Sequence, residues 1–170
     1  MGRRAARHRF VPHHYVFPGG RLDAADYRAV VASPLRPEVE RRLCEHCSPR
    51  LAHALAVAAA RETLEETGLS LGAPAPRLDR LDFILRAITP SSSPIRFHAR
   101  FFAVEASYLS GELVGNGELL DLAWRPLHEC LRLPIVDVTE FLLRRLAAGV
   151  QLAQGKPQLF SFRNGRALVR

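Results

Sequence analysis

The sequence predicts an α+β fold in which short strands and two or three helices pack as the layers of a sandwich. Two observations carry this prediction. The segment Arg50–Thr67 is rich in Ala and Leu, which are strong helix formers. Short apolar segments elsewhere are separated by loops that contain glycine, proline and serine. A chain of 170 residues is long enough for one hydrophobic core and short for two, so we expect a single domain over residues 1–170.

The first half of the chain is predicted to hold one short strand and two helices. The apolar segment that begins at Val16 is expected to be a strand, and it ends in a Gly19-Gly20 turn. Glycine permits positive φ and a close approach of the backbone to a ligand at such a turn. A helix is expected from about Pro37 to His46. The Ala- and Leu-rich helix follows and ends where Gly68 can supply a left-handed C-cap.

The second half is predicted to be mostly strands and loops. We expect strands at Leu81–Thr89, Arg96–Ala106 and Leu119–Trp124. Loops are expected at Thr89–Pro94 and Ser110–Gly117. A short helical turn should start at Pro126, and an amphipathic helix should cover Val138–Ala148. The segment Gln158–Arg170 should form a hairpin, because Asn164-Gly165 lies between two apolar stretches.

Three glutamates near the end of the long helix are the strongest functional signal in the chain. The spacing of Glu62, Glu65 and Glu66 places them on one helix face. Like charges at this spacing repel, and negative charge near a helix C-terminus opposes the helix dipole. A hard divalent cation would offset this cost, whereas a solvated acidic face is the alternative interpretation. Arg61 precedes the first glutamate and could orient a carboxylate by a bidentate contact.

Together with the Gly-Gly turn, this segment resembles the signature of the Nudix hydrolase family. Gly20 matches the first glycine of that signature, and its second half is matched by Arg61, Glu62, Glu65, Glu66, Gly68 and Leu69. Asp26 stands where the family usually has Glu, and Thr63 replaces an aliphatic residue. Residues 27–49 form an insertion between the two halves. The resemblance implies an α/β/α sandwich with a mixed β-sheet.

The insertion and its flanking stretches resemble the branch of the family that contains the peroxisomal coenzyme A diphosphatases. The matching stretches are Phe17–Asp26, Thr89-Pro90 and Arg96–Phe102, although His98 and Ala99 depart from the pattern. The resemblance implies a hydrolase that cleaves a diphosphate bond in a small molecule linked to a nucleoside diphosphate. Coenzyme A or acyl-CoA is the candidate substrate. The insertion could cover the site or mediate a homodimer.

The resemblance also assigns roles to individual residues. A Mg²⁺ or Mn²⁺ ion would be held by Glu62, Glu65, Glu66 and the carbonyl oxygen of Gly20. Catalysis would involve Glu65 and Glu66, and Arg61 would orient the glutamates of the signature. Glu118 is the expected general base from a later loop. Glu105 and Glu112 are weaker choices for the base, and a solvated loop carboxylate is the alternative for Glu118. Arginine binds phosphate well through its planar fork, so substrate phosphates are expected at Arg3, Arg4, Arg21 and Arg96.

Charge and apolar content limit the classes of partner. The net charge of +7 favours attraction of a polyanionic small molecule. The chain lacks the clustered basic stripe with interleaved aromatic residues that nucleic-acid binding requires, so no nucleic-acid partner is expected. No apolar run approaches the ~20 residues needed to span a bilayer, so no membrane association is expected either.

The three cysteines suit a reducing, cytoplasmic location better than a disulfide framework. Cys44 and Cys47 have the spacing of a zinc-binding pair, and His53 and Cys130 are conceivable additional ligands. A structural zinc site usually needs a second such pair, which this chain lacks. We therefore interpret Cys44 and Cys47 as ordinary residues of the inserted segment.

The start of the chain departs from the family pattern. Met1–Phe10 holds five basic residues, counting His8, and no acid, and it superficially resembles a transit peptide. Family members have matching Arg-rich sequence here, directly after an apolar strand that this chain does not show. We expect that strand to lie upstream of Met1, since its loss would expose a sheet edge. The alternative to an enzyme is therefore a catalytically inactive, Nudix-like nucleotide-binding module or an N-terminally truncated fragment.

Overall fold

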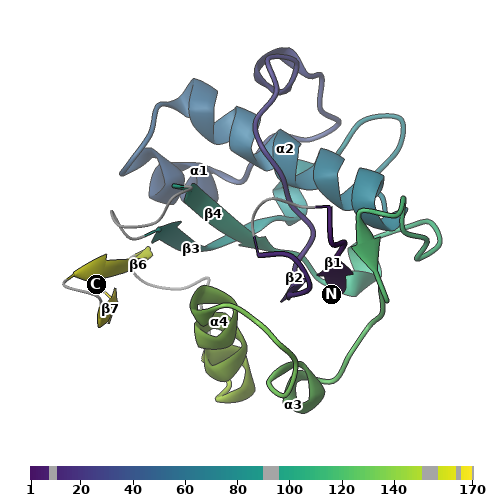
Figure 1. The fold of residues 1–170 in the computed structure, drawn as a ribbon. Helices are drawn as coiled ribbons and strands as arrows, with labels where there is room; N and C mark the ends of the chain where they lie inside the picture. The colour runs from purple at the N-terminus through teal and green to yellow at the C-terminus, as the bar shows by residue number, and fades with distance from the viewer. Residues whose placement is uncertain (8–10, 90–95, 151–156, 164–165, 170) are drawn as a thin grey trace.

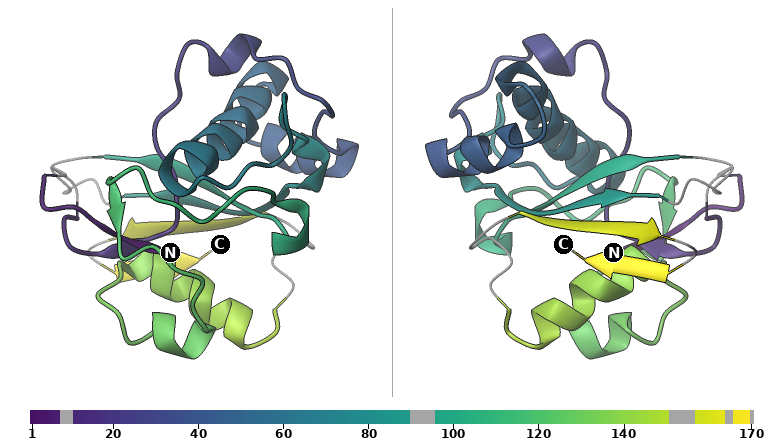
Figure 2. Two further views of the ribbon diagram at one scale, coloured as in Figure 1. Left: turned by 90° about the vertical axis from the view of Figure 1, so that its right-hand side faces the viewer. Right: turned by 90° about the vertical axis from the view of Figure 1, so that its left-hand side faces the viewer.

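The fold is described from a computed structural model of the chain. Residues 1–7, 11–89, 96–150, 157–163 and 166–169 are described. A four-stranded sheet lies between two layers of helices, with α1 and α2 on one face and α3 and α4 on the other (Figures 1 and 2). The predicted α+β sandwich with a mixed β-sheet is therefore confirmed.

The strands described here form two sheets. The central sheet has the order β4-β3-β6-β7, from β3 (Asp82–Ile88), β4 (His98–Ala103), β6 (Gln158–Arg163) and β7 (Arg166–Val169). β3 pairs antiparallel with β4 but parallel with β6, which makes this sheet mixed. A small antiparallel sheet has the order β2-β1-β5, from β1 (Gly2–Arg4), β2 (Tyr15–Val16) and β5 (Leu119–Leu120).

The helices divide between the two faces of the central sheet. The first face is covered by α1 (Pro37–Cys44) and α2 (Pro49–Thr67), and the second by α3 (Leu127–Cys130) and α4 (Asp137–Ala147). Short 3₁₀ helices lie in the connections, namely η1 (Asp26–Arg28), η2 (Leu78–Arg80) and η3 (Ala106–Tyr108). None of the described helices combines the length and the apolar character needed to cross a membrane.

β3 packs against both helical layers, because its side chains enter the hydrophobic cores on both faces of the sheet. Phe83 is buried with Val39 and Leu43 of α1 and with the alanine-rich face of α2. Leu85 is buried on the other side with Leu142 of α4. Each buried side chain of this kind stabilises the fold by about 2 kcal/mol, so the packing holds α2 firmly on the sheet. This packing sets the position of the glutamates at the end of α2.

α2 forms where the sequence predicts it, and both of its ends are capped. The Ser48 hydroxyl accepts a hydrogen bond from the Leu51 amide at 3.3 Å, and Pro49 occupies the first turn. At the other end, Gly68 has φ +73° and its amide donates to the Leu64 carbonyl at 2.8 Å. The predicted left-handed glycine cap is therefore confirmed. The cap ends the helix one residue after the last two glutamates.

The other predicted helices are confirmed to within two residues, whereas three strands are shorter than predicted. The strand expected to begin at Val16 is β2, which ends at Val16. The strand expected at Arg96–Ala106 covers only His98–Ala103. The strand expected at Leu119–Trp124 stops at Leu120, because Asp121 has φ +50° and cannot continue an extended strand.

The C-terminal hairpin is confirmed by the antiparallel pairing of β6 with β7. The Asn164-Gly165 turn that predicted it lies outside the described residues, as does most of the predicted loop Thr89–Pro94. β1 was not predicted, since Gly2–Arg4 lacks an alternating apolar pattern. It becomes a strand by pairing on both sides, with β2 and with β5.

Candidate active site

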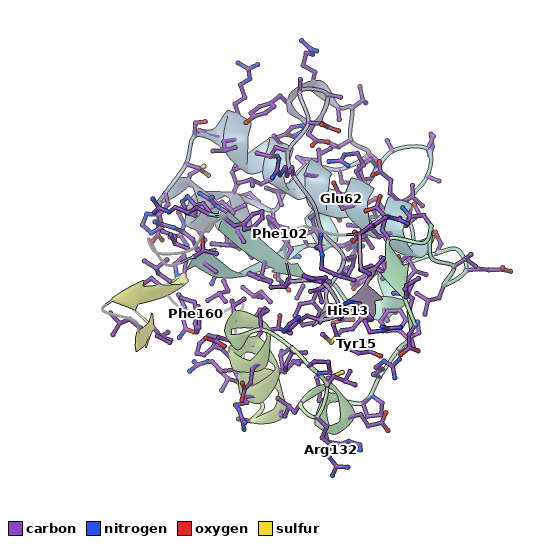
Figure 3. The ribbon with its side chains drawn as sticks, viewed as in Figure 1. His13, Tyr15, Glu62, Phe102, Arg132 and Phe160 are labelled. Carbon is purple, nitrogen blue, oxygen red and sulfur yellow. The ribbon has the colours of Figure 1, made fainter. Side chains whose placement is uncertain are left out.

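The Gly-Gly turn lies directly against two of the three glutamates, near the end of α2 that carries Glu62 (Figure 3). The Gly19 amide donates a hydrogen bond to the Glu66 carboxylate at 2.8 Å. A Cβ placed on Gly20 would stand 2.2 Å from a Glu62 carboxylate oxygen, so only glycine allows this approach. The two halves of the predicted site therefore meet across the inserted segment.

Arg61 joins these two halves. Its Nε and one terminal nitrogen donate to the two carboxylate oxygens of Asp26 at 3.0 and 3.1 Å. The other terminal nitrogen donates to Glu62 at 2.8 Å and to Glu65 at 3.1 Å. Arg61 also donates to the main-chain oxygen of Arg21 at 2.9 Å. A bidentate ion pair between Arg61 and Asp26 is directional as well as charged, so it fixes how Arg61 is oriented toward the glutamates.

Asp26 is the residue of this site that sequence reasoning missed. It is 1% exposed and accepts a hydrogen bond from the Asp23 amide at 2.7 Å. Burial alone would raise its pKa, but the hydrogen bonds from Arg61 and Asp23 lower the pKa below its usual value. The available signal was its place in the signature, where the family usually has another carboxylate. Its function here is to anchor Arg61.

Burial makes Glu62 and Glu66 weaker acids than an exposed glutamate. Glu66 is 3% exposed, and burial raises its pKa from 4.5 to about 7 against the opposing hydrogen bond from Gly19. Repulsion from Glu62 and Glu118 adds to that rise. Burial also raises the pKa of Glu62, although Arg61 opposes the shift. Glu65 differs from both, because its side chain is 52% exposed.

Of the three glutamates considered as general base, Glu118 is the one near the glutamates of α2. It is half-buried and raises the pKa of both Glu62 and Glu66, whereas Glu105 and Glu112 are exposed. The loop that carries Glu118 is held against the end of α2.

The loop and the helix end can approach each other because Gly68, Gly111 and Gly115 have no side chain. A Cβ on Gly111 would stand 2.4 Å from the Gly68 main-chain oxygen, and one on Gly115 would stand 3.0 Å from the Leu119 oxygen. The Val114 amide donates to the Thr67 carbonyl at 2.9 Å. The loop therefore packs backbone to backbone on the helix end, which brings Glu118 toward the glutamates.

The predicted arginines of β1 point to different environments. Arg4 lies near Glu66, whose pKa it lowers by charge attraction. Arg3 lies on the opposite face of the strand, near Tyr15 and Asp121. The hydrogen bond between these two residues raises the pKa of Tyr15 and lowers that of Asp121, and the charge of Arg3 opposes the first shift and adds to the second. Arg4 can therefore contact a substrate bound at the glutamates, whereas Arg3 lies with a separate cluster.

The other two predicted arginines also separate. Arg21 supplies its main-chain oxygen to Arg61, and the residue is otherwise exposed beside the Gly-Gly turn. Arg96 lies before β4 and lines a hollow with Phe97 and His98. In the described part of the chain, Arg96 forms no ion pair with the glutamates.

The donors at this site fit a hard divalent cation. Burial disfavours the charged form of both Glu62 and Glu66 when no cation is bound, and the glycine backbone approaches them closely. Within the residues that the structure describes, no group of three or more His, Cys, Asp or Glu side chains is arranged to hold a metal ion. Glu65 is 52% exposed, so the buried Glu66, the partly buried Glu62 and the Gly20 carbonyl are the principal candidate ligands. A zinc cluster around Cys44 and Cys47 is likewise not found among the described residues.

Comparison with known proteins supports this fold. No protein-family model matches the chain, and no curated protein matches it. A solved structure of a Nudix hydrolase from Alicyclobacillus acidocaldarius does match, with a TM-score of 0.68 and 25% sequence identity over 91% of this chain and 87% of that one. The chain therefore has the fold of a Nudix hydrolase. The likeness over nearly the whole chain supports the Nudix family as the class of protein to which it is related.

Substitution of Gly20 by alanine should disturb the site without unfolding the protein. The backbone of Gly20 needs no left-handed conformation, but the new Cβ would collide with the flexible end of Glu62. We expect Gly20→Ala to weaken Mn²⁺ binding by about tenfold, the lower range for a change beside a metal ligand. Calorimetric titration with Mn²⁺ measures this, with circular dichroism to verify the fold. An unchanged affinity would show that Glu62 does not hold the metal.

The metal-free protein should lose stability as the pH rises. Between pH 4.5 and about 7 the folded protein holds a proton on Glu66 that the unfolded chain releases, so stability falls with rising pH in that window. The full effect of this group is roughly 3 kcal/mol. Thermal unfolding in EDTA should show a Tm that decreases toward neutral pH, and Glu66→Gln should flatten that decrease. An equal decrease in the variant would assign it to other groups.

Proposed function

We propose that this chain is a metal-dependent hydrolase that cleaves the diphosphate bond of a small molecule linked to a nucleoside diphosphate. The observation that carries the proposal is the pair of glutamates held against Gly19-Gly20 at the end of a Nudix-fold helix, the buried Glu66 and the partly buried Glu62. Coenzyme A and acyl-CoA are the first candidate substrates, because Phe17–Asp26 resembles the corresponding branch of the family.

Each residue of the site has a distinct part in this proposal. Mg²⁺ or Mn²⁺ would be held by the carboxylates of Glu62 and Glu66 with the Gly20 carbonyl, and Glu65 is the further predicted ligand. Such an ion neutralises a diphosphate and acidifies water. Glu118 is the proposed general base, because its charge lies near enough to raise the pKa of both Glu62 and Glu66.

The cationic residues orient the site and the substrate. Arg61 holds the glutamates in place through Asp26 and so acts by positioning. The charge of Arg4 opposes the rise in the pKa of Glu66, so Arg4 is near this carboxylate and is the proposed contact for a phosphate oxygen. Displacement at phosphorus depends mainly on positioning and charge stabilisation, which these groups supply.

A substrate panel tests the proposal. The full chain is incubated with Mg²⁺ or Mn²⁺ and coenzyme A, acyl-CoA, ADP-ribose, dinucleotides or nucleoside triphosphates. We expect turnover of a compound with an internal diphosphate, abolished by EDTA and by Glu66→Gln. Glu129→Gln is a matched control, because this exposed carboxylate lies in α3 on the other face of the sheet.

The same panel distinguishes the alternative. Binding of a nucleotide without turnover, equal in the wild type and in Glu66→Gln, would instead identify an inactive nucleotide-binding module. Turnover of coenzyme A or its esters in preference to the other compounds would support the more specific assignment.

A further inference from the structure

A group of cationic side chains lies on the central sheet, away from the glutamates. In the β3–β4 ladder, Arg86 stands directly opposite Arg100. His98 lies two residues before Arg100 on the same face, and Arg86 Nε donates to its Nε2 at 2.7 Å. Arg100 also interacts with Cys47, which lies between α1 and α2. The group is therefore beside the start of α2, under the layer formed by α1 (Figure 1).

No side-chain carboxylate of the described residues forms an ion pair with these charges. Every Asp and Glu side chain of the chain belongs to the described residues. None of the ion pairs formed there includes Arg86 or Arg100. Like charges directly opposite each other on adjacent strands destabilise a sheet. An anion bound between the two guanidinium groups would convert this repulsion into attraction.

His98 supplies a further donor. Burial, with the charges of Arg100 and Arg86, lowers the pKa of His98 to about 4, so its imidazole is neutral at physiological pH. Since Nε2 accepts the hydrogen bond from Arg86, the ring proton lies on Nδ1, which can donate to an anion. Burial and the charge of Arg86 also lower the pKa of Arg100. Burial is the larger cause of both shifts, and the neighbouring positive charges add to it.

A hollow adjoins this group at His98. It has a volume of about 320 Å³ and is lined by Ile88, Arg96, Phe97 and His98. This volume is at the lower end of the range for small-ligand sites. Arg96 adds a third guanidinium group at its edge, and no acidic residue lines it.

We propose that Arg86, His98 and Arg100, with Arg96 at the edge of the hollow, form a second binding site for a phosphate dianion. The ligand is free phosphate or the phosphate monoester of a small molecule, since both offer the same oxygens to the two guanidinium groups. α2 has 19 residues and is therefore about 28 Å long, and the two sites lie at its opposite ends. The proposed site is thus separate from the glutamates and does not depend on the proposed hydrolase activity.

Binding of inorganic phosphate tests the proposal. The full chain is titrated in EDTA, so that the metal-free glutamates repel the anion, at constant ionic strength set with chloride. NMR shifts of the β3 and β4 amides report the site, and adenosine 5′-monophosphate is titrated in parallel. We expect saturable shifts at Arg86, His98 and Arg100 that weaken by about tenfold in Arg100→Gln or Arg86→Gln. Tighter binding of the nucleotide would identify a monoester as the ligand, and equal binding would identify phosphate itself.

A matched control separates this effect from net charge. Arg132 is exposed near α3, far from β4, so Arg132→Gln removes the same charge elsewhere (Figure 3). This control should bind phosphate as the wild type does. A second readout is the Tm in chloride alone, which Arg86→Gln should raise by relieving the repulsion with Arg100. Equal phosphate affinity in all four proteins, or shifts confined to the glutamate end of α2, would overturn the proposal.

Discussion

Glu66→Gln is expected to lower the hydrolytic rate by a factor on the order of 10³. Glu66 is buried, bonded to Gly19 and close to both Glu62 and Glu118, so its charge belongs to the centre of the site. Glutamine keeps the oxygen that accepts the Gly19 hydrogen bond but removes the negative charge. Initial rates on the best substrate of the panel, at saturating Mg²⁺, measure the effect.

The stability of this variant provides an independent result. Because burial disfavours the charge of Glu66, removing that charge should leave the Tm of the metal-free protein unchanged or raise it near neutral pH. Glu65→Gln should have a smaller effect on rate, since Glu65 is half-exposed and paired with Arg61. A Glu66→Gln enzyme with wild-type activity would remove Glu66 from the catalytic centre.

Arg61→Ala is expected to destabilise the protein by roughly 3 kcal/mol or more, because it leaves the Asp26 carboxylate buried without its cation. It also frees Glu62 and Glu65 from the contact that orients them, so activity should fall with stability. Denaturant unfolding measures the first effect. Arg61→Lys should recover only part of it, since a single ammonium group cannot make the bidentate contact.

A surface pair is the matched control for this prediction. Arg144 and Glu140 lie four residues apart in α4 with nitrogen–oxygen distances of 2.8 and 2.6 Å, and both side chains are exposed. Arg144→Ala should cost less than about 1 kcal/mol, the usual value for an exposed ion pair. If Arg61→Ala cost no more than Arg144→Ala, the contact with Asp26 would not be what joins the two halves of the site.

The sequence predicted the elements whose local signals are strong. α2 follows from its alanine-rich composition, and its end follows from Gly68, which only the left-handed cap explains. The approach of Gly20 to Glu62 was expected from the pairing of a Gly-Gly turn with carboxylates on one helix face. These features depend on residues within a few positions of each other, or on a recognisable spacing.

The features that escaped prediction depend on contacts between distant residues. β1 is a strand only because β2 and β5 pair with it, and Gly2–Arg4 carries no strand pattern of its own. The role of Asp26 appears only when η1 packs on α2 and brings it to Arg61. The opposition of Arg86 and Arg100 depends on strand register, which an arginine count cannot reveal.

The contact between Asp26 and Arg61 closes a loop whose ends are 35 positions apart in the chain. The entropy of closing such a loop grows only with the logarithm of its length, so doubling the loop costs roughly 0.6 kcal/mol. Residues 49–61 of this loop belong to α2 and pack on the sheet, but the part before α2 can change in length at a small cost in closure entropy. Its present content is held by Val39 and Leu43, which are buried against α2. The geometry of the catalytic centre and the length of this segment are thus free to evolve independently.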